Sequence, residues 1–284
     1  MKNIKLNPLS LLVGSAATAG LFLLSSMQGT LTTERIFTLT PEQAEILSHQ
    51  SIVYLDDGQG GRVKTLRISR IKVQIVNGTG ATNGYPADPD SIDPLDTQTN
   101  GVGNLIVGYN ELGNVWFGDD RTGSHNLVVG HGNSYTSFGG RVGPLNNAVS
   151  GPFASVVGGQ INTASGPLSS VSGGFNNKAT GFSSSVSGGR NNTASGQRSS
   201  VSGGYFNTAS GLDSSVSGGG LNRASWVRSS VSGGRGNLAS GIDSSVSGGA
   251  FGTASGYKSS VSGGSNRTAP GDRNWVAGDL FQDH

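Results

Sequence analysis

The sequence predicts an all-β protein whose larger part is a parallel β-solenoid built from a 15-residue repeat. Valine recurs at this period from Val156 to Val276, and alanine recurs in a fixed phase with it from Ala164 to Ala269. A Gly-Gly pair follows most of the valines, so that the unit reads roughly N-x-A-S-G-x-x-S-S-V-S-G-G-x-x. A fixed period of this kind is typical of architectures in which each repeat stacks on its neighbours.

Each unit contains two short strands, one centred on the valine and one on the alanine. Because side chains alternate across a strand, Val201 should point inward while Ser200 and Ser202 point outward. The glycines are expected at corners where the backbone takes positive φ angles. Stacked coils would pair as parallel strands about 4.8 Å apart. The residues predicted to point inward are Val171, Val186, Val201, Val216, Val231, Val246 and Val261, with Ala164, Ala179, Ala194, Ala209, Ala224, Ala239 and Ala254.

An asparagine stands two residues before the alanine in most units, from Asn162 to Asn237. We expect this column to form a ladder of side-chain amides along the stack. Residues 104–108 and 126–130, which read N-L-I-V-G and N-L-V-V-G, are predicted to be irregular earlier coils. Val149 then takes the alanine position, and Arg141 falls in the first inward valine position.

The composition excludes several classes of function. Of the 284 residues, 48 are glycine, 13% are charged and 33% are hydrophobic, which is little material for a thick globular core. The basic residues are scattered in a chain of net charge +2, so no nucleic-acid surface is predicted. The absence of cysteine excludes disulfides, thiol catalysis and Cys-ligated metals.

Residues 1–29 are predicted to be an export signal, because Lys2 and Lys5 precede a mostly apolar stretch from Leu9 to Leu24. An uncleaved membrane anchor is the alternative, although the stretch is slightly short for it. No other segment is apolar enough to cross a membrane as a helix, so the mature chain is expected to have no membrane span. These features predict a secreted or cell-surface protein.

Residues 30–77 are predicted to form a small α+β segment. Residues 40–43, Thr-Pro-Glu-Gln, have the capping residues of a helix start, and the helix should run to about Leu47. Three strands are expected after it, at residues 52–55, 63–68 and 71–75.

Residues 78–103 are predicted to be a polar linker to the repeat domain, residues 104–279, which a C-terminal tail at 280–284 follows. A Ca²⁺ site in this linker is the alternative, because hard cations prefer oxygen ligands. The spacing of its carboxylates differs from that of an EF-hand. They belong to Asp88, Asp90, Asp93 and Asp96.

The motif N-x-A-S-G…S-S-V-S-G-G, with N-L-V-V-G upstream, resembles the head repeats of trimeric autotransporter adhesins, the YadA-like head. The resemblance covers about residues 104–279. It implies a left-handed parallel β-roll that trimerises and an adhesive function outside the cell. Those adhesins continue into a coiled-coil stalk and a membrane barrel, whereas this sequence shows neither heptads nor barrel strands. Trp226 also stands at a corner that is otherwise glycine.

The core predicted for a single chain is narrow, with one valine and one alanine in each coil. Burial of these two side chains offsets only part of the conformational entropy lost by the residues of the coil. We therefore expect a second close-packed surface, which serines flanked by glycine would allow. Self-association is predicted, most simply as a homotrimer around the solenoid axis.

No catalytic constellation is present in the sequence, and neither an enzyme activity nor a cofactor or metal site is predicted. His125 and His131 could form a metal pair near a corner, but ordinary surface histidines are the favoured interpretation. The corners of the repeat vary most, which suits ligand display on a rigid scaffold. Aromatic residues are favoured at interfaces. Contacts with a ligand are therefore proposed for Tyr205, Phe206, Trp226, Phe251 and Tyr257.

The sequence thus favours a non-catalytic structural or adhesion protein, whose partners are its own copies and a cell-surface or matrix molecule. Corners that tolerate any residue, or that pack on a neighbouring chain, are the alternative to ligand contacts. An ice-binding solenoid is the alternative function, although Lys178, Arg223 and Leu238 interrupt its threonine file. An enzyme acting on polysaccharides would need clustered carboxylates, which the repeats almost lack. The outward pairs that suggest ice binding are Thr193/Ser195, Thr208/Ser210 and Thr253/Ser255.

Overall fold

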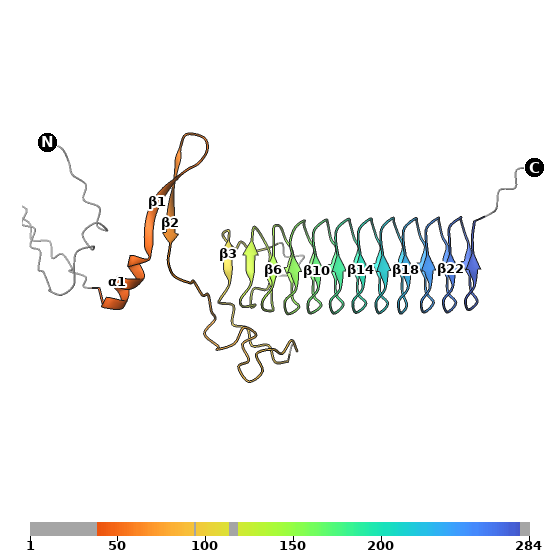
Figure 1. Cartoon of the computed structure of the whole chain (residues 1–284), viewed down its shortest axis with the longest axis horizontal. Helices are drawn as coiled ribbons and strands as arrows, with labels where there is room; N and C mark the ends of the chain where they lie inside the picture. Colours follow the sequence, from red (N-terminus) through yellow and green to blue (C-terminus); the bar gives the residue numbers. More distant parts are fainter. Residues whose placement is uncertain (1–38, 94, 114–118, 279–284) are drawn as a thin grey trace, which may run out of the picture. The chain divides into compact units, whose positions relative to one another are not determined.

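The computed structural model describes residues 39–93, 95–113 and 119–278 (Figure 1). The predicted export signal and the predicted C-terminal tail lie outside the described residues. The chain divides into two compact units, Met1–Lys72 and Val73–His284, and each is described by itself. Within the described ranges, no helix has both the length and the apolar character that a membrane crossing requires.

The N-terminal unit begins with a short helix, α1 (Pro41–Ser48). Its start forms the predicted capping box: the Gln43 N–H donates to Thr40 Oγ1 at 3.2 Å, and the Thr40 N–H donates to Gln43 Oε1 at 2.9 Å. Pro41 occupies the first turn, where its missing N–H has no partner to lose. The predicted helix is therefore confirmed.

An antiparallel hairpin of β1 (Gln50–Asp56) and β2 (Arg62–Ile68) follows the helix, as the first two predicted strands required. Asp57 organises its turn, because Oδ1 accepts the N–H groups of Gln59 and Gly61 at 2.9 and 2.8 Å. These two hydrogen bonds hold the pKa of the Asp57 carboxyl below its usual value.

The third predicted strand, at residues 71–75, is wrong. The chain leaves β2 through Arg70, which has a φ of 63°, and residues 71–75 enter no sheet. Ile71, Val73 and Ile75 are 45%, 59% and 44% exposed. Alternating apolar residues form a strand only when a neighbouring strand is close enough to pair with them. Here the turn at Arg70 directs the chain away from the β1–β2 hairpin, so residues 71–75 have no strand to pair with.

The second unit is a parallel β-solenoid with two main sheets, and Figure 1 shows its coils in a row. The 12-stranded sheet, here called the valine sheet, consists of β3 (Leu105–Val107), β4 (Leu127–Val129), β6 (Arg141–Val142), β8 (Ser155–Val156), β10 (Ser170–Val171), β12 (Ser185–Val186), β14 (Ser200–Val201), β16 (Ser215–Val216), β18 (Ser230–Val231), β20 (Ser245–Val246), β22 (Ser260–Val261) and β24 (Trp275–Val276).

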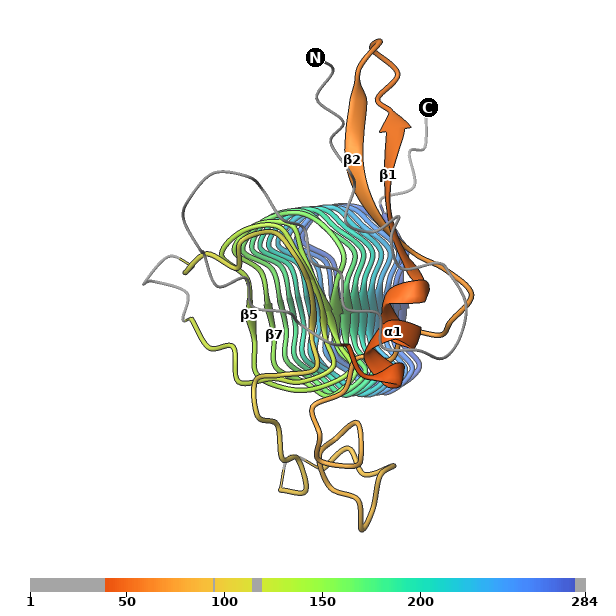
Figure 2. The same ribbon diagram turned by 90° about the vertical axis from the view of Figure 1, so that its left-hand side faces the viewer.

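The 10-stranded sheet, here called the alanine sheet, alternates with the valine sheet along the chain. It consists of β5 (Ser134–Tyr135), β7 (Ala148–Val149), β9 (Thr163–Ala164), β11 (Lys178–Ala179), β13 (Thr193–Ala194), β15 (Thr208–Ala209), β17 (Arg223–Ala224), β19 (Leu238–Ala239), β21 (Thr253–Ala254) and β23 (Thr268–Ala269). Every strand pairs in parallel with the equivalent strand one coil away, so that Val186 lies between Val171 and Val201. The end-on view shows successive coils overlying one another (Figure 2). The predicted all-β fold is therefore confirmed.

The core consists of the two columns named from the sequence. Val171 and the later valines up to Val261 are 0–1% exposed, and the alanines from Ala164 to Ala269 are 0% exposed. Tyr135 and Val149 occupy the alanine position of two earlier coils. A core of two small side chains per coil leaves the remaining stabilisation to hydrogen bonds between coils.

Arg141 does not point into the core, contrary to the sequence-based expectation. Val142 takes the inward position and is 0% exposed, while Arg141 is exposed and lies beside Ser155 in the neighbouring strand. The reason is the length of the early coils, because Val128, Val142 and Val156 follow one another at intervals of 14 residues. Counting back in steps of 15 residues therefore misplaces the register by one.

The asparagine column forms a ladder, but between side chain and backbone. Asn192 donates from Nδ2 to the carbonyls of Gly188 and Gly204, both at 2.9 Å, and its Oδ1 accepts the Asn207 N–H at 2.9 Å. The expected ladder of side-chain amides therefore runs along the stack, with its hydrogen bonds in the regular coils made to backbone groups. Each buried amide instead satisfies polar groups at a corner where the strands cannot supply partners.

Two kinds of glycine shape the corners. The second glycine of each pair has the predicted positive φ, as at Gly189 with 83°. Gly196 is required for another reason, because a Cβ there would lie 2.0 Å from the carbonyl oxygen of Gly211 in the next coil. Trp226 stands at the position that corresponds to Gly196 in its own coil. Its backbone N–H donates to Ser229 Oγ at 3.1 Å.

Residues 78–93 and 95–103 form turns and bends. Asn83 organises part of this segment, since its side chain is 0% exposed and donates to the carbonyls of Asp88 and Ser91.

Candidate functional site

Each regular coil has two corners that carry its variable residues. The Gly-Gly corner follows the valine strand, and the single-Gly corner follows the alanine strand. The second variable residue of each corner takes a left-handed conformation even when it is not glycine, as at Arg198 (φ 54°) and Phe206 (φ 53°). Such residues are uncommon outside turns, and here the hydrogen bonds between coils hold them. The Phe206 N–H donates to the Arg190 carbonyl at 3.0 Å.

Exposed aromatic residues lie on the Gly-Gly corner at Phe175 and at Tyr205 and Phe206, with Arg190 in the coil between them. The rings of Tyr205 and Phe206 meet edge to face with centroids 6.4 Å apart, and both residues are exposed, at 45% and 52%. One coil earlier, the Arg190 guanidinium lies 5.6 Å from the ring centroid of Phe175. Phe175, Arg190 and Tyr205 are joined by parallel bridges, so this corner presents a short strip of rings and one cation.

Two glycines make room for aromatic rings of the Gly-Gly corner, one for Tyr205 in the strip and one for Phe251 three coils later. A Cβ on Gly220 would lie 2.2 Å from the Tyr205 ring, and a Cβ on Gly236 would lie 2.8 Å from the Phe251 ring. The rings therefore lie along the corner, over the backbone of a neighbouring coil. This arrangement leaves one face of each ring for contact with another molecule.

The five aromatic residues proposed as ligand contacts lie on different corners. Tyr205, Phe206 and Phe251 are on the Gly-Gly corner, whereas Trp226 and Tyr257 are on the single-Gly corner. The structure thus brings Tyr205 and Phe206 together but does not unite the five in one surface. The assignment of these residues to two corners could have been made from the sequence, because the Gly-Gly-corner residues and the single-Gly-corner residues fall at different positions of the 15-residue repeat.

The single-Gly corner carries a ladder of alternating charges, here called the charged ladder: Arg198, Asp213, Arg228, Asp243 and Lys258. Arg198 donates from Nε and Nη2 to the two carboxylate oxygens of Asp213 at 2.6 and 2.8 Å. Arg228 and Asp243 form the same bidentate pair. The arginine hydrogen bonds hold the pKa of both carboxyl groups below the usual value.

The sequence-based prediction missed this ladder. Its signal was present, because residues of opposite charge stand one repeat apart. Sequence reasoning can find such pairs once side chains one period apart are known to be spatial neighbours.

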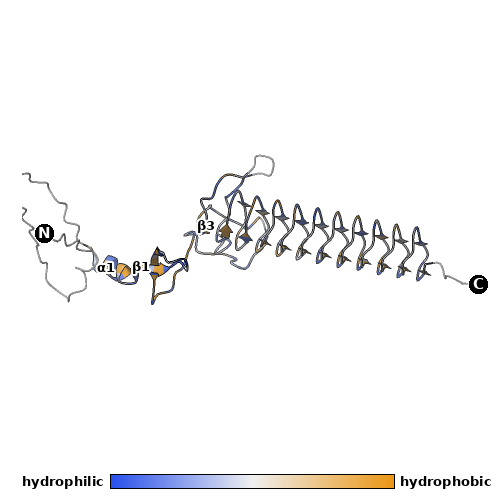
Figure 3. Cartoon of the chain, turned by 90° about the horizontal axis from the view of Figure 1, so that it is seen from above, coloured by the Kyte–Doolittle hydropathy of each residue, from blue (hydrophilic) through white to orange (hydrophobic). Residues whose placement is uncertain are grey.

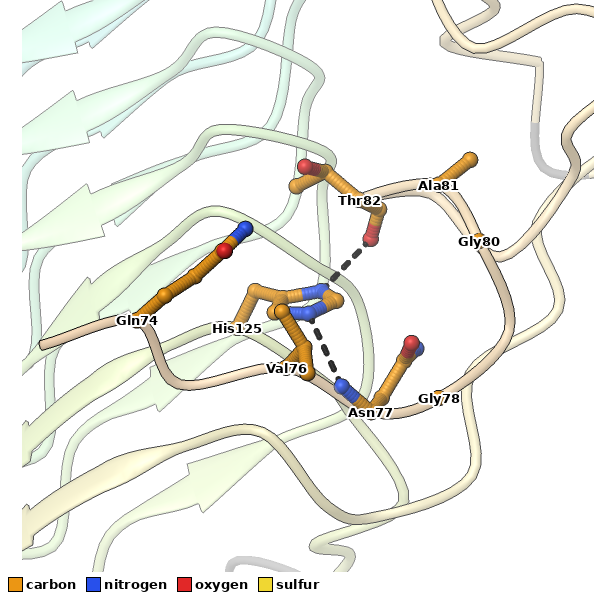
Figure 4. A pocket seen from close by; sticks show the side chains of 8 residues that line it. All are labelled: Gln74, Val76, Asn77, Gly78, Gly80, Ala81, Thr82 and His125. Carbon is orange, nitrogen blue, oxygen red and sulfur yellow. Dashed lines mark hydrogen bonds between the residues drawn. The ribbon is translucent and has the colours of Figure 1, made fainter. Parts of the chain in front are cut away.

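A pocket of about 360 Å³ lies between residues 74–82 and the early coil that contains His125 (Figure 4). His125 reaches into it and is held on both ring nitrogens: Nε2 accepts the Asn77 N–H at 3.2 Å, and Nδ1 donates to the Thr82 carbonyl at 2.9 Å. The neutral imidazole satisfies both bonds at once. His125 therefore fastens the loop at residues 77–82 to the solenoid. The other residues that line the pocket are Gln74, Val76, Gly78, Gly80 and Ala81.

The two candidate histidines do not come together. His125 is on the single-Gly corner, whereas His131 is on the Gly-Gly corner, bridged to Leu145 and 3.6 Å from Glu111. Across the described ranges, no group of three His, Cys, Asp or Glu residues is placed to hold a metal ion, and this includes the carboxylates of residues 88–96.

No protein-family model matches the sequence, and no curated protein matches it either. The parallel solenoid is compatible with a β-roll repeat protein.

Proposed function

We propose that this protein is an extracellular, non-catalytic adhesion or structural protein of the kind that its YadA-like repeats suggest. The aromatic strip at the Gly-Gly corner carries the proposal. Tyr205 and Phe206 are adjacent and exposed, and contiguous exposed apolar surface indicates a site of contact with another molecule. They stand on a backbone that is hydrogen-bonded from coil to coil, so that binding would cost little ordering.

The chemistry of the strip favours a partner with flat apolar faces and hydrogen-bond acceptors. The rings of Phe175, Tyr205 and Phe206 offer apolar faces, and Arg190 offers planar donors. A cell-surface or matrix molecule is the class of partner that we infer. The apolar stretch from Leu9 to Leu24 supports export, which brings the protein to such a partner.

A non-catalytic role is supported by the state of the carboxylates in the repeats. Asp213 and Asp243 are each engaged by an arginine with both oxygens. The paired arginines lower the pKa of each carboxyl, which makes it a poor general acid. These residues therefore stabilise a corner in our proposal.

Binding of the full-length protein to immobilised matrix proteins and polysaccharides tests the proposal. The double variant Tyr205→Ala/Phe206→Ala should lose at least tenfold in affinity for the molecule that the wild type binds. Tyr257→Ala is the matched control, since it removes an exposed ring from the other corner and should leave affinity unchanged. Wild-type affinity that persists in the double variant would defeat the assignment.

Self-association as a homotrimer is the second part of the proposal. The narrow core supports it, because the apolar side chains that one chain buries in each regular coil are one valine and one alanine. Sedimentation equilibrium of the full-length protein at micromolar concentration should give three times the chain mass. A folded species with the mass of one chain contradicts this part.

Ice binding is a second candidate function, which the outward hydroxyl files favour. Thr193 and Thr208 are paired neighbours in the alanine sheet and both point outward. Arg223 and Leu238 then continue the same file, which breaks its regularity. A thermal-hysteresis measurement on the purified protein separates this candidate from adhesion.

A further inference from the structure

Several cations at one edge of the solenoid have no carboxylate partner. All of them are exposed, and within the described residues none forms an ion pair. The arginines of the charged ladder differ, because Asp213 and Asp243 engage them with both carboxylate oxygens. The repeats thus neutralise the arginines of one corner and leave the cations beside the other corner uncompensated. These cations are Lys178, Arg190, Arg223 and Arg235.

Strand pairing arranges these cations in two neighbouring files. Equivalent positions of successive coils form a line along the solenoid, as the row of coils in Figure 3 shows. One file follows the bridges of the Gly-Gly corner and consists of Arg190, Tyr205, Gly220 and Arg235. The other file is the outward position of the alanine sheet next to this corner and consists of Lys178, Thr193, Thr208 and Arg223. We call these two files together the cation frame.

The cations of the frame form two equivalent pairs. Arg190 stands in the coil after Lys178, and Arg235 stands in the coil after Arg223, at the same positions of the repeat. The two pairs are three repeats apart, which corresponds to about 14 Å at the strand spacing of a sheet. Tyr205 belongs to the coil midway between the pairs. The frame is therefore positive at both ends and neutral at its centre.

An aromatic surface and hydroxyl groups occupy the centre of the frame. The exposed Tyr205 ring lies over Gly220, where an added Cβ would lie 2.2 Å from the ring. Thr193 and Thr208, which pair in the other file, place their side chains on the outer face. A sugar ring has C–H groups on its faces and hydroxyls at its edge, and the negative face of an aromatic ring attracts such C–H groups. The centre of the frame therefore suits a sugar.

We propose that the cation frame binds an acidic polysaccharide, whose carboxylates contact the two cation pairs and whose sugar rings lie on Tyr205 and Phe206 between them. This inference rests on the proposed adhesive function and names the class of its partner. Arginine matches a carboxylate with two parallel N–H donors, and a surface of one sign attracts a polyanion before contact. The backbone of the frame is hydrogen-bonded from coil to coil, so binding orders little besides side chains.

The spacing of the cations distinguishes between kinds of polyanion. A nucleic-acid strand has one phosphate for about every 3.4 Å of helix axis, so a groove for it would need cations in every coil. The coil of Tyr205 has none. A polysaccharide with neutral sugar faces and hydroxyls between its carboxylates fits the interval between the pairs. An acidic peptide has the charge but lacks flat rings for Tyr205 and Phe206 to contact.

Binding of the full-length protein to immobilised hyaluronan, alginate and polygalacturonate tests the proposal, with the methyl ester of each polymer as its uncharged counterpart. At least one acidic polymer should bind, and its methyl ester should bind about tenfold more weakly. Added salt should weaken the binding, because exposed charges are screened. Failure of all three acidic polymers, or equal binding of the esters, overturns the proposal. Tighter binding of a single-stranded oligonucleotide or of polyglutamate overturns it as well.

The double variant Arg190→Gln/Arg235→Gln tests the frame itself. It should lose about tenfold in affinity for the acidic polymer. Lys258→Gln/Arg273→Gln is the matched control, since it removes the same charge from exposed positions of the single-Gly corner and should keep wild-type affinity. Circular dichroism should be the same for all three proteins, because the substituted side chains are exposed. Wild-type affinity in the frame variant, or equal losses in the two variants, overturns the proposal.

The aromatic variant separates this inference from the adhesive function. A neutral polymer or matrix protein that is lost in Tyr205→Ala/Phe206→Ala, but bound normally by the frame variant, overturns the acidic partner and leaves adhesion in place. Wild-type affinity of Tyr205→Ala/Phe206→Ala for every ligand contradicts the adhesive assignment and this inference together.

Discussion

The Asn192 side chain accepts the backbone N–H of Asn207, one coil later, at 2.9 Å. The same amide donates to two glycine carbonyls, at positions 188 and 204, so that one side chain joins three stretches of backbone. Both asparagines are 0% exposed. Buried polar groups of this kind are costly when they lose their partners.

Asn192→Ala should therefore destabilise the solenoid by about 2–4 kcal/mol, because it leaves buried backbone groups without partners. Urea denaturation followed by circular dichroism measures the change in free energy of unfolding. Gln197→Ala, at an exposed corner of the same coil, is the control and should change stability by less than about 0.5 kcal/mol. An Asn192→Ala variant as stable as the control would show that the column does not join the coils.

The glycine that follows each alanine strand gives a second prediction. A Cβ on Gly196 would lie 2.0 Å from the Gly211 oxygen, which belongs to the tightly stacked backbone of the next coil. Gly196→Ala should cost about 3 kcal/mol or more, since the coils would have to separate locally. Ser195→Ala, at the exposed neighbouring position, is the comparison in thermal denaturation. Similar melting temperatures for the two variants would contradict this account of the glycine.

The core and the strand register could be predicted from the sequence, because the solenoid has one period throughout its regular part. Val201 and Ala209 are buried because side chains alternate between the two faces of a strand, and these two residues point to the inner face. Contacts between coils were harder to predict. The partners of the asparagine amides depend on which atoms face one another, and a repeat pattern does not specify this. The Arg198–Asp213 pair could have been found, because its residues stand one repeat apart.

The errors arose where local periodicity was the only guide. Ile71, Val73 and Ile75 alternate as a strand would, but the backbone turns at Arg70 and no partner strand lies beside them. Arg141 falls in the inward position of the 15-residue count only because that count is extended into coils that are one residue shorter. The turn at Arg70 and the 14-residue coils leave no mark in the residue composition, so the sequence pattern gave no sign of either.

The corrected register at the shorter coils is itself testable. Val142→Ser should destabilise the protein by about 3 kcal/mol, because it removes buried methyl groups and buries a hydroxyl. Arg141→Ser replaces the exposed neighbour and should change stability by less than about 0.5 kcal/mol. Chemical denaturation of both variants decides the register. A larger loss of stability in Arg141→Ser than in Val142→Ser would show that Arg141 points inward.

The charged ladder predicts the pH dependence of individual carboxyl groups. The Arg198 guanidinium donates to Asp213 and lowers its pKa in the folded protein. A depressed folded-state pKa contributes stability above the unfolded-state pKa, and this contribution is lost as the pH falls through the folded-state value. The window therefore lies on the acidic side of the usual Asp pKa, at about pH 4 and below.

Arg198→Ala should raise the pKa of Asp213 towards its ordinary value, as measured from carboxyl chemical shifts in an NMR titration. Asp243 provides an internal control, because its pKa is lowered by Arg228 and Lys258 and should stay unchanged in this variant. Added salt should reduce the difference between wild type and variant, since both side chains are partly exposed. A pKa of Asp213 that is the same in both proteins would show that the bidentate pair does not persist in solution.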